Sequence, residues 1–347
     1  MTRPLRLVAV LLGSLLAGAC GEGSATVEFR SENAVATSGP GLAAPSVVPR
    51  VTQHAQLAIR HYGRRVVESC DWSGDTPHTT RFREDITSDG EGRYAIEPIE
   101  EIEGAIPDWP LFRLMQLARQ GMVHRYRDAA VRDTMLFAAN WQLTDLGLQS
   151  MIAGRRCDLY AMSRTVGTAR SYTLSIDQET GLILRYAEKD SLGRLLSRVE
   201  YESVDYDPDL GGVVWYEEDE REQLDLQGDL AAQLGFVPLL PDLVPLGYAL
   251  RQAQQVEVGD ERWLNLVYSD GVDTLFFVQS FPPLAPRQGA GAGGPGDLHA
   301  AGASDRVAIL PIGSARAAQG RVSGRGIIAV GKVAEAELLD LIESALN

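Results

Sequence analysis

Two glycine-rich stretches come close to motifs that bind phosphate groups. Gly289, Gly291 and Gly294 have the GxGxxG spacing, but a dinucleotide site needs these glycines between a strand and a helix. Here they stand in a run of glycine and alanine that is typical of a linker. The stretch 326–332 (GIIAVGK) resembles a phosphate-binding loop, yet Val333 follows it and offers no hydroxyl to magnesium. We therefore expect no nucleotide site.

Histidine and carboxylate side chains form no catalytic or metal-binding pattern. The chain has five histidines, and His54 and His61 lack the HExxH spacing and a third ligand nearby. There is no GxSxG motif for a nucleophilic serine. No carboxylate stands alone in an apolar run, where burial would raise its pKa. The sequence therefore predicts a non-enzymatic protein without metal or cofactor, and a hydrolase of the envelope is the less favoured alternative.

The first residues have the features of an export signal. Arg3 and Arg6 precede an apolar run that is short for a membrane span, and Ala17-Gly18-Ala19 offers a cleavage site. Cleavage of a signal peptide at residues 1–19 leaves Cys20 first, and this cysteine resembles the lipid anchor of bacterial lipoproteins. The alternative is ordinary cleavage that leaves a free cysteine. We expect export to the periplasm of a bacterial cell envelope and attachment to the membrane through a lipid on Cys20.

Composition restricts the partners of the mature chain. Removing Arg3 and Arg6 with the signal peptide lowers the formal net charge from −15 to −17. Such a surface repels nucleic acid and anionic lipid headgroups, so we expect membrane contact only through the N-terminal lipid, while a basic protein partner would be attracted. Residues 20–49 are rich in glycine, alanine, serine and proline without periodicity, which predicts a disordered tether.

Alternating apolar and polar residues between positions 172 and 204 predict three antiparallel strands. In each run the apolar residues share one face, which indicates half-buried strands. Turns that end in Gly181 and Gly193 separate the runs, because a tight turn needs positive φ there. Further elements expected before this meander are helices over 50–62 and 106–132 and strands over 64–72, 79–86, 94–102, 141–148 and 155–163.

Four motifs and the C-terminal tail carry a family resemblance. They are 153–157 (AGRRC), 172–182 (YTLSIDQETGL), 192–196 (LGRLL), 268–272 (YSDGV) and the strand, glycine and helix of 326–347. In order and spacing they resemble the MucB/RseB family of periplasmic proteins, which regulate an anti-sigma factor and have an N-terminal domain related to LolA and LolB. The resemblance implies an α+β fold: a curved antiparallel half-barrel sheet with helices on its concave face, followed by a smaller α+β C-terminal domain.

The resemblance also implies a lipid-binding or lipoprotein-binding domain over 50–207, with an apolar cavity for acyl chains between helices and sheet. A plain packed core is the alternative. Residues 79–140 depart from the family pattern, which leaves the ligand open. The pocket candidates are Trp109, Phe112, Met115, Trp141, Tyr172, Leu174, Leu184, Tyr186, Val199 and Tyr201.

An acidic linker over 208–235 is expected to lead to the C-terminal domain over 236–347, which has a flexible insertion over 286–305. The expected elements of this domain are strands over 248–256, 262–269, 274–281, 307–312, 317–322 and 327–330 and a helix over 332–346. By resemblance the domain binds the periplasmic region of an anti-sigma factor, and the partner-binding candidates are Tyr268, Asp270 and Gly271. Formation of a hairpin turn is the alternative role of these three residues.

The predicted function is an envelope sensor and regulator that binds a lipid or lipoprotein signal. The alternative is a lipid or lipoprotein carrier of the outer-membrane lipoprotein-sorting type without a regulatory partner. With Cys20 lipidated, Cys70 and Cys157 form an even pair in an oxidising compartment. A disulfide between them and two small buried side chains are both compatible with the sequence.

Overall fold

The structure is a computed structural model, and it describes residues 47–72, 76–103, 106, 108–117, 127–167, 170–216, 222–258, 261–281, 308–312, 315–322 and 325–345. The predicted signal peptide, Cys20, most of the tether and the insertion over 286–305 lie outside these residues. The chain divides into two compact units. The first contains the described residues up to 216 together with Asp270–Val272, and the second contains the remaining described residues.

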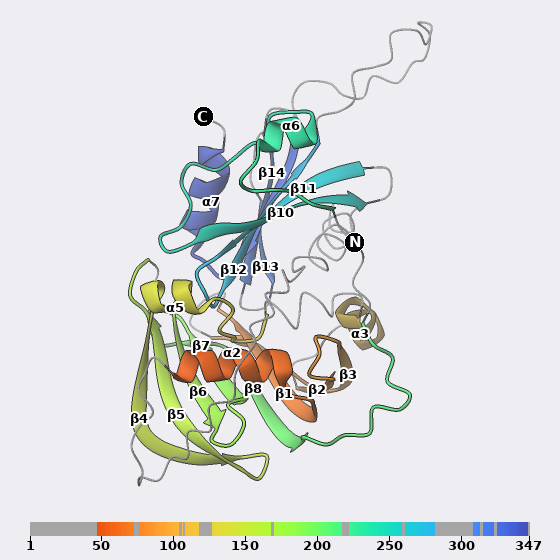
Figure 1. The fold of residues 1–347 in the computed structure, drawn as a ribbon, viewed down its shortest axis with the longest axis vertical. Helices are drawn as coiled ribbons and strands as arrows, with labels where there is room; N and C mark the ends of the chain where they lie inside the picture. The colour runs from red at the N-terminus through yellow and green to blue at the C-terminus, as the bar shows by residue number, and fades with distance from the viewer. Residues whose placement is uncertain are drawn as a thin grey trace, which may run out of the picture. The chain divides into compact units, whose positions relative to one another are not determined.

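The first unit is built on one eight-stranded antiparallel sheet. Its strand order is β3-β2-β1-β8-β7-β6-β5-β4, so the sheet is open, with β3 and β4 at its edges (Figure 1). This arrangement confirms the predicted fold class, a curved and mainly antiparallel sheet with few helices. The strands are β1 His61–Asp71, β2 His78–Ser88, β3 Tyr94–Glu103, β4 Trp141–Ile152, β5 Arg155–Arg164, β6 Ser171–Asp177, β7 Ile183–Lys189 and β8 Leu195–Asp205.

Helix α2 (Val48–Ala58) lies across the strands of this sheet (Figure 1). Ala55 is fully buried in a cluster with Ile86, Leu184 and Tyr201. The helix was predicted to run to residue 62, but it ends at Ala58. Gly63 directly follows the predicted helix, where a glycine is typical of a helix stop. It belongs instead to β1, where an added Cβ would lie 2.3 Å from Cε1 of Tyr201. Because glycine has no side chain, the Tyr201 ring can pack closely against β1 at this position.

The predicted helix over 106–132 is wrong at its C-terminal end, and residues 118–126 lie outside the described part of the chain. Helix α3 covers Trp109–Leu117, and residues 129–133 are not helical. A separate helix, α5 (Thr134–Asn140), follows them. The Asp133 side chain begins α5 by accepting hydrogen bonds from the backbone N–H groups of Met135 and Leu136, both at 2.9 Å. An aspartate that satisfies two free N–H groups marks a helix start, and the apolar spacing alone obscured this boundary.

The second unit contains a seven-stranded antiparallel sheet with the order β13-β14-β15-β12-β11-β10-β9. Helix α7 (Glu335–Ser344) buries Leu338, Leu341 and Ile342 in the same apolar cluster as the strand residues Ile327 and Ala329. Part of the predicted linker has regular structure, since strand β9 (Glu222–Gln223) and helix α6 (Leu230–Leu234) lie within it. The other strands are β10 Ala249–Val258, β11 Glu261–Ser269, β12 Thr274–Ser280, β13 Ala308–Ile312, β14 Ala315–Val322 and β15 Arg325–Gly331.

Candidate functional site

A cavity of about 400 Å³ lies within the first unit. Helix α2, the segment 129–132 and strands β1, β2, β7 and β8 contribute to its wall. Apolar side chains of the wall include Ile86, Leu182, Ile183, Leu184 and Val199. A volume of this size falls within the range of small-molecule pockets, about 300–1,000 Å³. The cavity is therefore the candidate ligand site of this unit.

The alternating pattern of the meander positions this wall. Leu184 and Tyr186 are two residues apart on β7, and Val199 and Tyr201 are two apart on β8, so each pair points to one face. Tyr186 stands opposite Val199 in the strand register. All four are buried and all four line the cavity. The predicted apolar face of the second and third runs thus forms part of the cavity wall.

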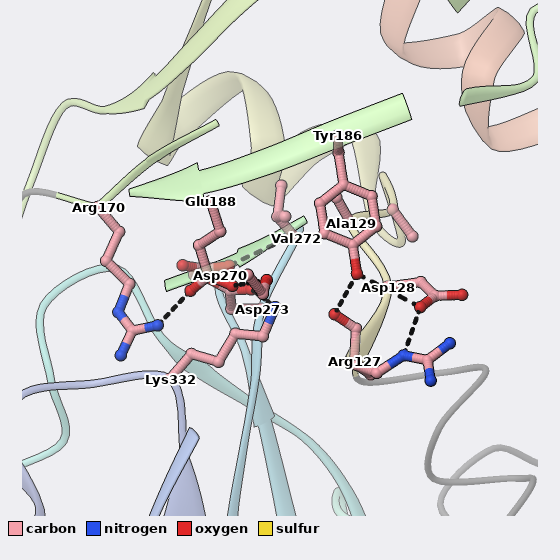
Figure 2. Close-up of polar contacts among 12 residues, drawn as sticks. Arg127, Asp128, Ala129, Arg170, Tyr186, Glu188, Asp270, Val272, Asp273 and Lys332 are labelled. Carbon is pink, nitrogen blue, oxygen red and sulfur yellow. Dashed lines mark hydrogen bonds and ion pairs between the residues drawn. The ribbon is translucent and has the colours of Figure 1, made fainter. Parts of the chain in front are cut away.

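Four charged side chains form a cluster beside the cavity, and two of them, Arg65 and Asp128, line it. The Nε of Arg65 lies 2.7 Å from Oε1 of Glu84, and its Nη1 lies 2.8 Å from Oδ2 of Asp128. Arg127 reaches Glu84 at 2.5 Å and Asp128 at 2.9 Å. The Tyr186 hydroxyl is 3.2 Å from the backbone oxygen of Arg127 and points to Asp128 (Figure 2). Two cations and two anions therefore compensate one another in this charged cluster.

Burial makes the pairing within the charged cluster necessary. The side chain of Glu84 is 1% exposed and that of Arg65 is 4% exposed. Burial acts to lower the pKa of Arg65, but the charges of Asp128 and Glu84 outweigh it and hold the pKa above its ordinary value. Burial, together with the charge of Asp128, raises the pKa of Tyr186. The charges of Asp128 and Glu84 likewise hold the pKa of Arg127 above its ordinary value, so both arginines are charged at neutral pH and the tyrosine is a neutral donor.

A histidine adds a neutral polar group to the wall. His61 begins β1 and is buried. Its Nδ1 is 3.0 Å from the backbone oxygen of Ile59, and its Nε2 is 3.4 Å from the Tyr201 hydroxyl. Burial lowers the pKa of His61 to about 4, and the nearby charge of Arg65 adds to that effect. At neutral pH the imidazole is therefore uncharged and offers polarity without charge.

The pocket candidates divide between the cavity and the packed core. Leu184, Tyr186, Val199 and Tyr201 line the cavity. Trp141, Tyr172 and Leu174 lie in one buried apolar cluster, the partly buried Trp109 and Phe112 pack against that cluster, and none of the five lines the cavity. The rings of Trp109 and Phe112 stack at 5.5 Å, and those of Trp141 and Tyr172 lie 5.8 Å apart. The Met115 side chain lies outside the described part of the chain.

Sequence reasoning missed the polar half of the site. Arg65 shares a face of β1 with the buried residues Gly63 and Val67, so the period of two was a usable signal that its side chain points inward. Asp128 stands in the charged stretch 125–128 (RYRD), a pattern typical of an exposed segment, but it is 9% exposed. Its burial depends on a long-range partner on β1, and local sequence gives no sign of that pairing.

The three partner-binding candidates are buried within the chain. Tyr268 on β11 belongs to the apolar core of the second unit, where burial raises the pKa of its hydroxyl above the ordinary value. Asp270 is fully buried, and its backbone oxygen accepts a hydrogen bond from Nδ2 of Asn140 at 3.1 Å. The Gly271 oxygen accepts from the N–H of Arg132 at 2.8 Å. These contacts give the residues a structural role inside the chain.

Cys70 and Cys157 are free and buried. Cys70 lies on β1 and Cys157 on β5, and three strands stand between β1 and β5 in the sheet. Four strand spacings amount to roughly 19 Å, whereas a disulfide needs Cα atoms within about 7 Å. The disulfide alternative is therefore not realised, and the two residues act as small buried side chains.

Metal binding and membrane spanning find no support in the described part of the chain. No cluster of three or more histidine, cysteine, aspartate or glutamate side chains there is arranged to hold a metal ion. None of the helices in the described ranges has the length and apolar character that crossing a membrane requires.

The fold and the cavity define a class of protein: an open, curved antiparallel sheet with a cavity on its helix-covered face, joined in one chain to a smaller α+β unit. No protein-family profile matches the sequence, and no curated protein matches it. Among solved structures, the chain is similar to MucB in complex with MucA(peri), at 16% identity over 88% of this chain and 98% of that one, with a TM-score of 0.48.

The MucA/MucB complex of Pseudomonas aeruginosa is similar at 17% identity over 88% of this chain and 98% of that one, with a TM-score of 0.47. A putative outer membrane lipoprotein-sorting protein domain from Vibrio parahaemolyticus is similar at 8% identity over 49% of this chain and 94% of that one, with a TM-score of 0.20. MucB is the protein whose family the sequence motifs resemble.

Proposed function

We propose that this protein is a non-enzymatic regulator of the cell envelope, in which the first unit binds an acyl-bearing lipid or lipoprotein and the second binds an anti-sigma factor. The observation that carries the ligand half is the cavity of about 400 Å³ on the helix-covered face of the first sheet. A cavity with apolar walls and a few convergent polar groups is typical of small-molecule sites. The partner half is supported by the motifs shared with the MucB/RseB family.

The cavity walls favour an acyl chain over a polar metabolite. Leu184 is fully buried and Val199 is 2% exposed, yet both border the cavity. Ile86 and Ala129, at 2% and 4% exposed, add to the same surface. Among the charged groups of the wall, Arg65 and Asp128 already pair with each other. A flexible apolar chain gains from burial against such a surface.

A partner for the second unit is proposed from sequence and charge. MucB has been solved in complex with MucA(peri), and the motif 268–272 of this chain resembles the corresponding family hairpin. The net charge of −15 favours association with a basic segment through long-range attraction. We propose the periplasmic region of an anti-sigma factor as that segment, with the protein held at the envelope by a lipid on Cys20.

Native mass spectrometry of the mature protein, purified from its host, tests the ligand half. The expected result is an added mass equal to that of an acyl-bearing molecule. Ala130 lines the cavity and is partly buried, so Ala130→Phe should displace the added mass. Ala161 on β5 is also partly buried but lies outside the cavity, and Ala161→Phe should retain it. A protein without added mass, which also binds no added acyl lipid, would refute this half.

The partner half needs its own measurement. Calorimetric titration with the purified periplasmic segment of an anti-sigma factor from the same organism should show saturable binding, weaker at high salt because the attraction is partly electrostatic. Absence of binding, together with acyl ligand bound, would favour the carrier without a regulatory partner. Metabolic labelling with a palmitate analogue tests the anchor: the wild type should be labelled and Cys20→Ser should not.

A further inference from the structure

Exposed apolar side chains gather in one segment of the second unit. The segment 237–246 lies between α6 and β10 and contains Val237, Leu240, Leu243 and Leu246, which are between 47% and 73% exposed. Among the side chains that the structure describes in this unit, no other large apolar one is exposed. Single exposed leucines are ordinary on a protein surface, but a group of them indicates an interaction site. We call these four side chains the apolar stripe.

The spacing of the apolar stripe places its members on one side of the segment. They recur at every third position, and the segment contains three prolines and forms neither helix nor strand. Prolines favour the polyproline II conformation, whose three residues per turn bring every third side chain to the same side. Pro238, Pro241 and Pro245 are buried. The prolines therefore pack on the unit, while the apolar stripe faces outward.

Side-chain hydrogen bonds hold the backbone of this segment. The fully buried amide of Gln279 on β12 accepts from the N–H of Leu239 at 2.8 Å and donates to the Leu239 oxygen at 2.6 Å. Further along, where the segment passes α7 (Figure 1), the N–H of Leu243 donates to the Ser344 hydroxyl at 3.0 Å. An anchored segment loses little conformational freedom when a partner binds. The apolar stripe is therefore preorganised for contact.

Three carboxylates lie near the Leu243 end of the apolar stripe. Asp242 directly precedes Leu243 and is exposed. On α7, Glu343 is the residue before Ser344, and Asp340 lies about one helical turn before it; both are exposed. Exposed negative charges attract basic side chains and repel acidic ones. This end of the stripe therefore favours a partner that carries lysine or arginine.

A cation lies at the opposite end of the segment. Nη1 of Arg325 donates to the backbone oxygen of Val237 at 3.0 Å and to Oε1 of Gln279 at 3.3 Å, and its guanidinium lies over the ring of Phe236. Three carboxylates and one guanidinium leave an excess of negative charge along the stripe. Basic side chains of a partner are therefore expected at the Leu243 end rather than at the Val237 end.

We propose that the apolar stripe is the surface through which the second unit binds its partner, a peptide segment that combines apolar side chains with lysine or arginine. This inference rests on the proposed function, and it supplies the binding surface that the buried hairpin 268–272 does not offer. A second copy of the chain would present the same carboxylates, and anionic lipid headgroups are repelled by them. The charges therefore favour a basic peptide over both of these occupants.

Calorimetric titration of the full-length protein with the periplasmic segment of an anti-sigma factor from the same organism tests the surface. Burying one leucine side chain corresponds to about tenfold in affinity or more, so Leu243→Ala with Leu246→Ala should bind at least about tenfold more weakly. Leu148→Ala with Leu192→Ala is the control, because these two leucines of the first unit are 58% and 75% exposed; it should bind like the wild type.

A second pair of variants tests the charges. Asp340→Asn with Glu343→Gln should weaken binding and make it less sensitive to salt, because part of the electrostatic attraction is removed. Glu91→Gln with Glu103→Gln changes the net charge equally at exposed positions of the first unit, and it should keep the salt dependence of the wild type. An equal loss of salt dependence in both variants would overturn the assignment of the basic side chains to α7.

The outcomes separate this inference from the function on which it rests. If the segment does not bind the wild type, the proposed partner function fails, and this inference fails with it. If the wild type and the double leucine variant of the stripe bind the segment equally, the partner function stands and the surface is overturned. If ultracentrifugation shows a wild-type dimer that the same variant does not form, the stripe joins two copies and the proposal is wrong.

Hydroxyl-radical footprinting of the wild-type complex decides the question without any substitution. The bound segment should protect the side chains of 237–246 from oxidation, while Leu192 in the turn between β7 and β8 should react as in the free protein. Unchanged oxidation of 237–246 in a saturated complex would overturn the proposal.

Discussion

Glu84→Gln should destabilise the first unit more than any exposed substitution in its sheet. Glu84 is fully buried and accepts from Arg65 at 2.7 Å and from Arg127 at 2.5 and 3.0 Å. Replacing the carboxylate with an amide leaves two buried guanidinium groups with Asp128 as the remaining anion of the charged cluster. Breaking a buried ion pair by removing one partner costs about 3–5 kcal/mol. We expect a loss at the lower end of that range, because the amide oxygen still accepts one hydrogen bond.

The measurement is urea unfolding followed by circular dichroism, with hydrogen exchange by mass spectrometry to locate the loss in β1 and β2. Glu202→Gln is the matched control, since Glu202 is 40% exposed and pairs with Arg83 at 2.6 Å; exposed pairs contribute less than about 1 kcal/mol. Arg65→Met added to Glu84→Gln should recover part of the loss by restoring neutrality. Equal stability of Glu84→Gln and Glu202→Gln would refute the reasoning.

Three further predictions follow from single residues. Gly271→Ala should lower stability, because φ is +103° and an added Cβ would lie 2.3 Å from the backbone nitrogen of Phe137; a melting temperature equal to wild type would contradict this. Burial lowers the pKa of His61 to about 4, so the folded protein holds the neutral imidazole and its free energy of unfolding should fall as the pH drops below about 6.5. The expected fall between pH 6.5 and 4.5 is about 2 kcal/mol. In urea titrations at these two pH values, His61→Gln should show a correspondingly smaller fall. Cys70 and Cys157 are free and buried, so iodoacetamide should alkylate them only after denaturation, and peptide mapping that finds them linked or labelled in the native protein would overturn that assignment.

The strands could be predicted because their signal is local. Alternation at Tyr172, Leu174 and Ile176 and at Leu184 and Tyr186 reflects one buried face, and the structure shows these residues buried. Turn glycines added a second local signal, since Gly181 and Gly193 both adopt positive φ. Because the alternating residues and the glycines agreed, the meander was predicted closely.

The helix ends and the polar side chains of the site could not be predicted, because they depend on contacts between residues that are distant in sequence. Gly63 looked like a helix stop, but its small size serves the approach of Tyr201 on β8. Asp128 looked exposed in a charged run, but its carboxylate pairs with Arg65, which lies 63 positions earlier. The pocket candidates Trp141 and Tyr172 showed the opposite error, because their rings pack against each other and fill space. Periodicity shows which side chains point inward, and it does not show whether they enclose a cavity or fill the core.

Photocrosslinking with an acyl ester that carries a diazirine in its chain tests the central claim most directly. The probe is added to the full-length protein, irradiated and mapped by peptide mass spectrometry, with excess methyl tetradecanoate as competitor. Labels on Ile183 and Leu184 of β7 or on segment 129–132, removed by the competitor, are the predicted result, because these residues line the cavity. Labels found only on exposed residues elsewhere, and unaffected by the competitor, would contradict an acyl-binding site in the cavity.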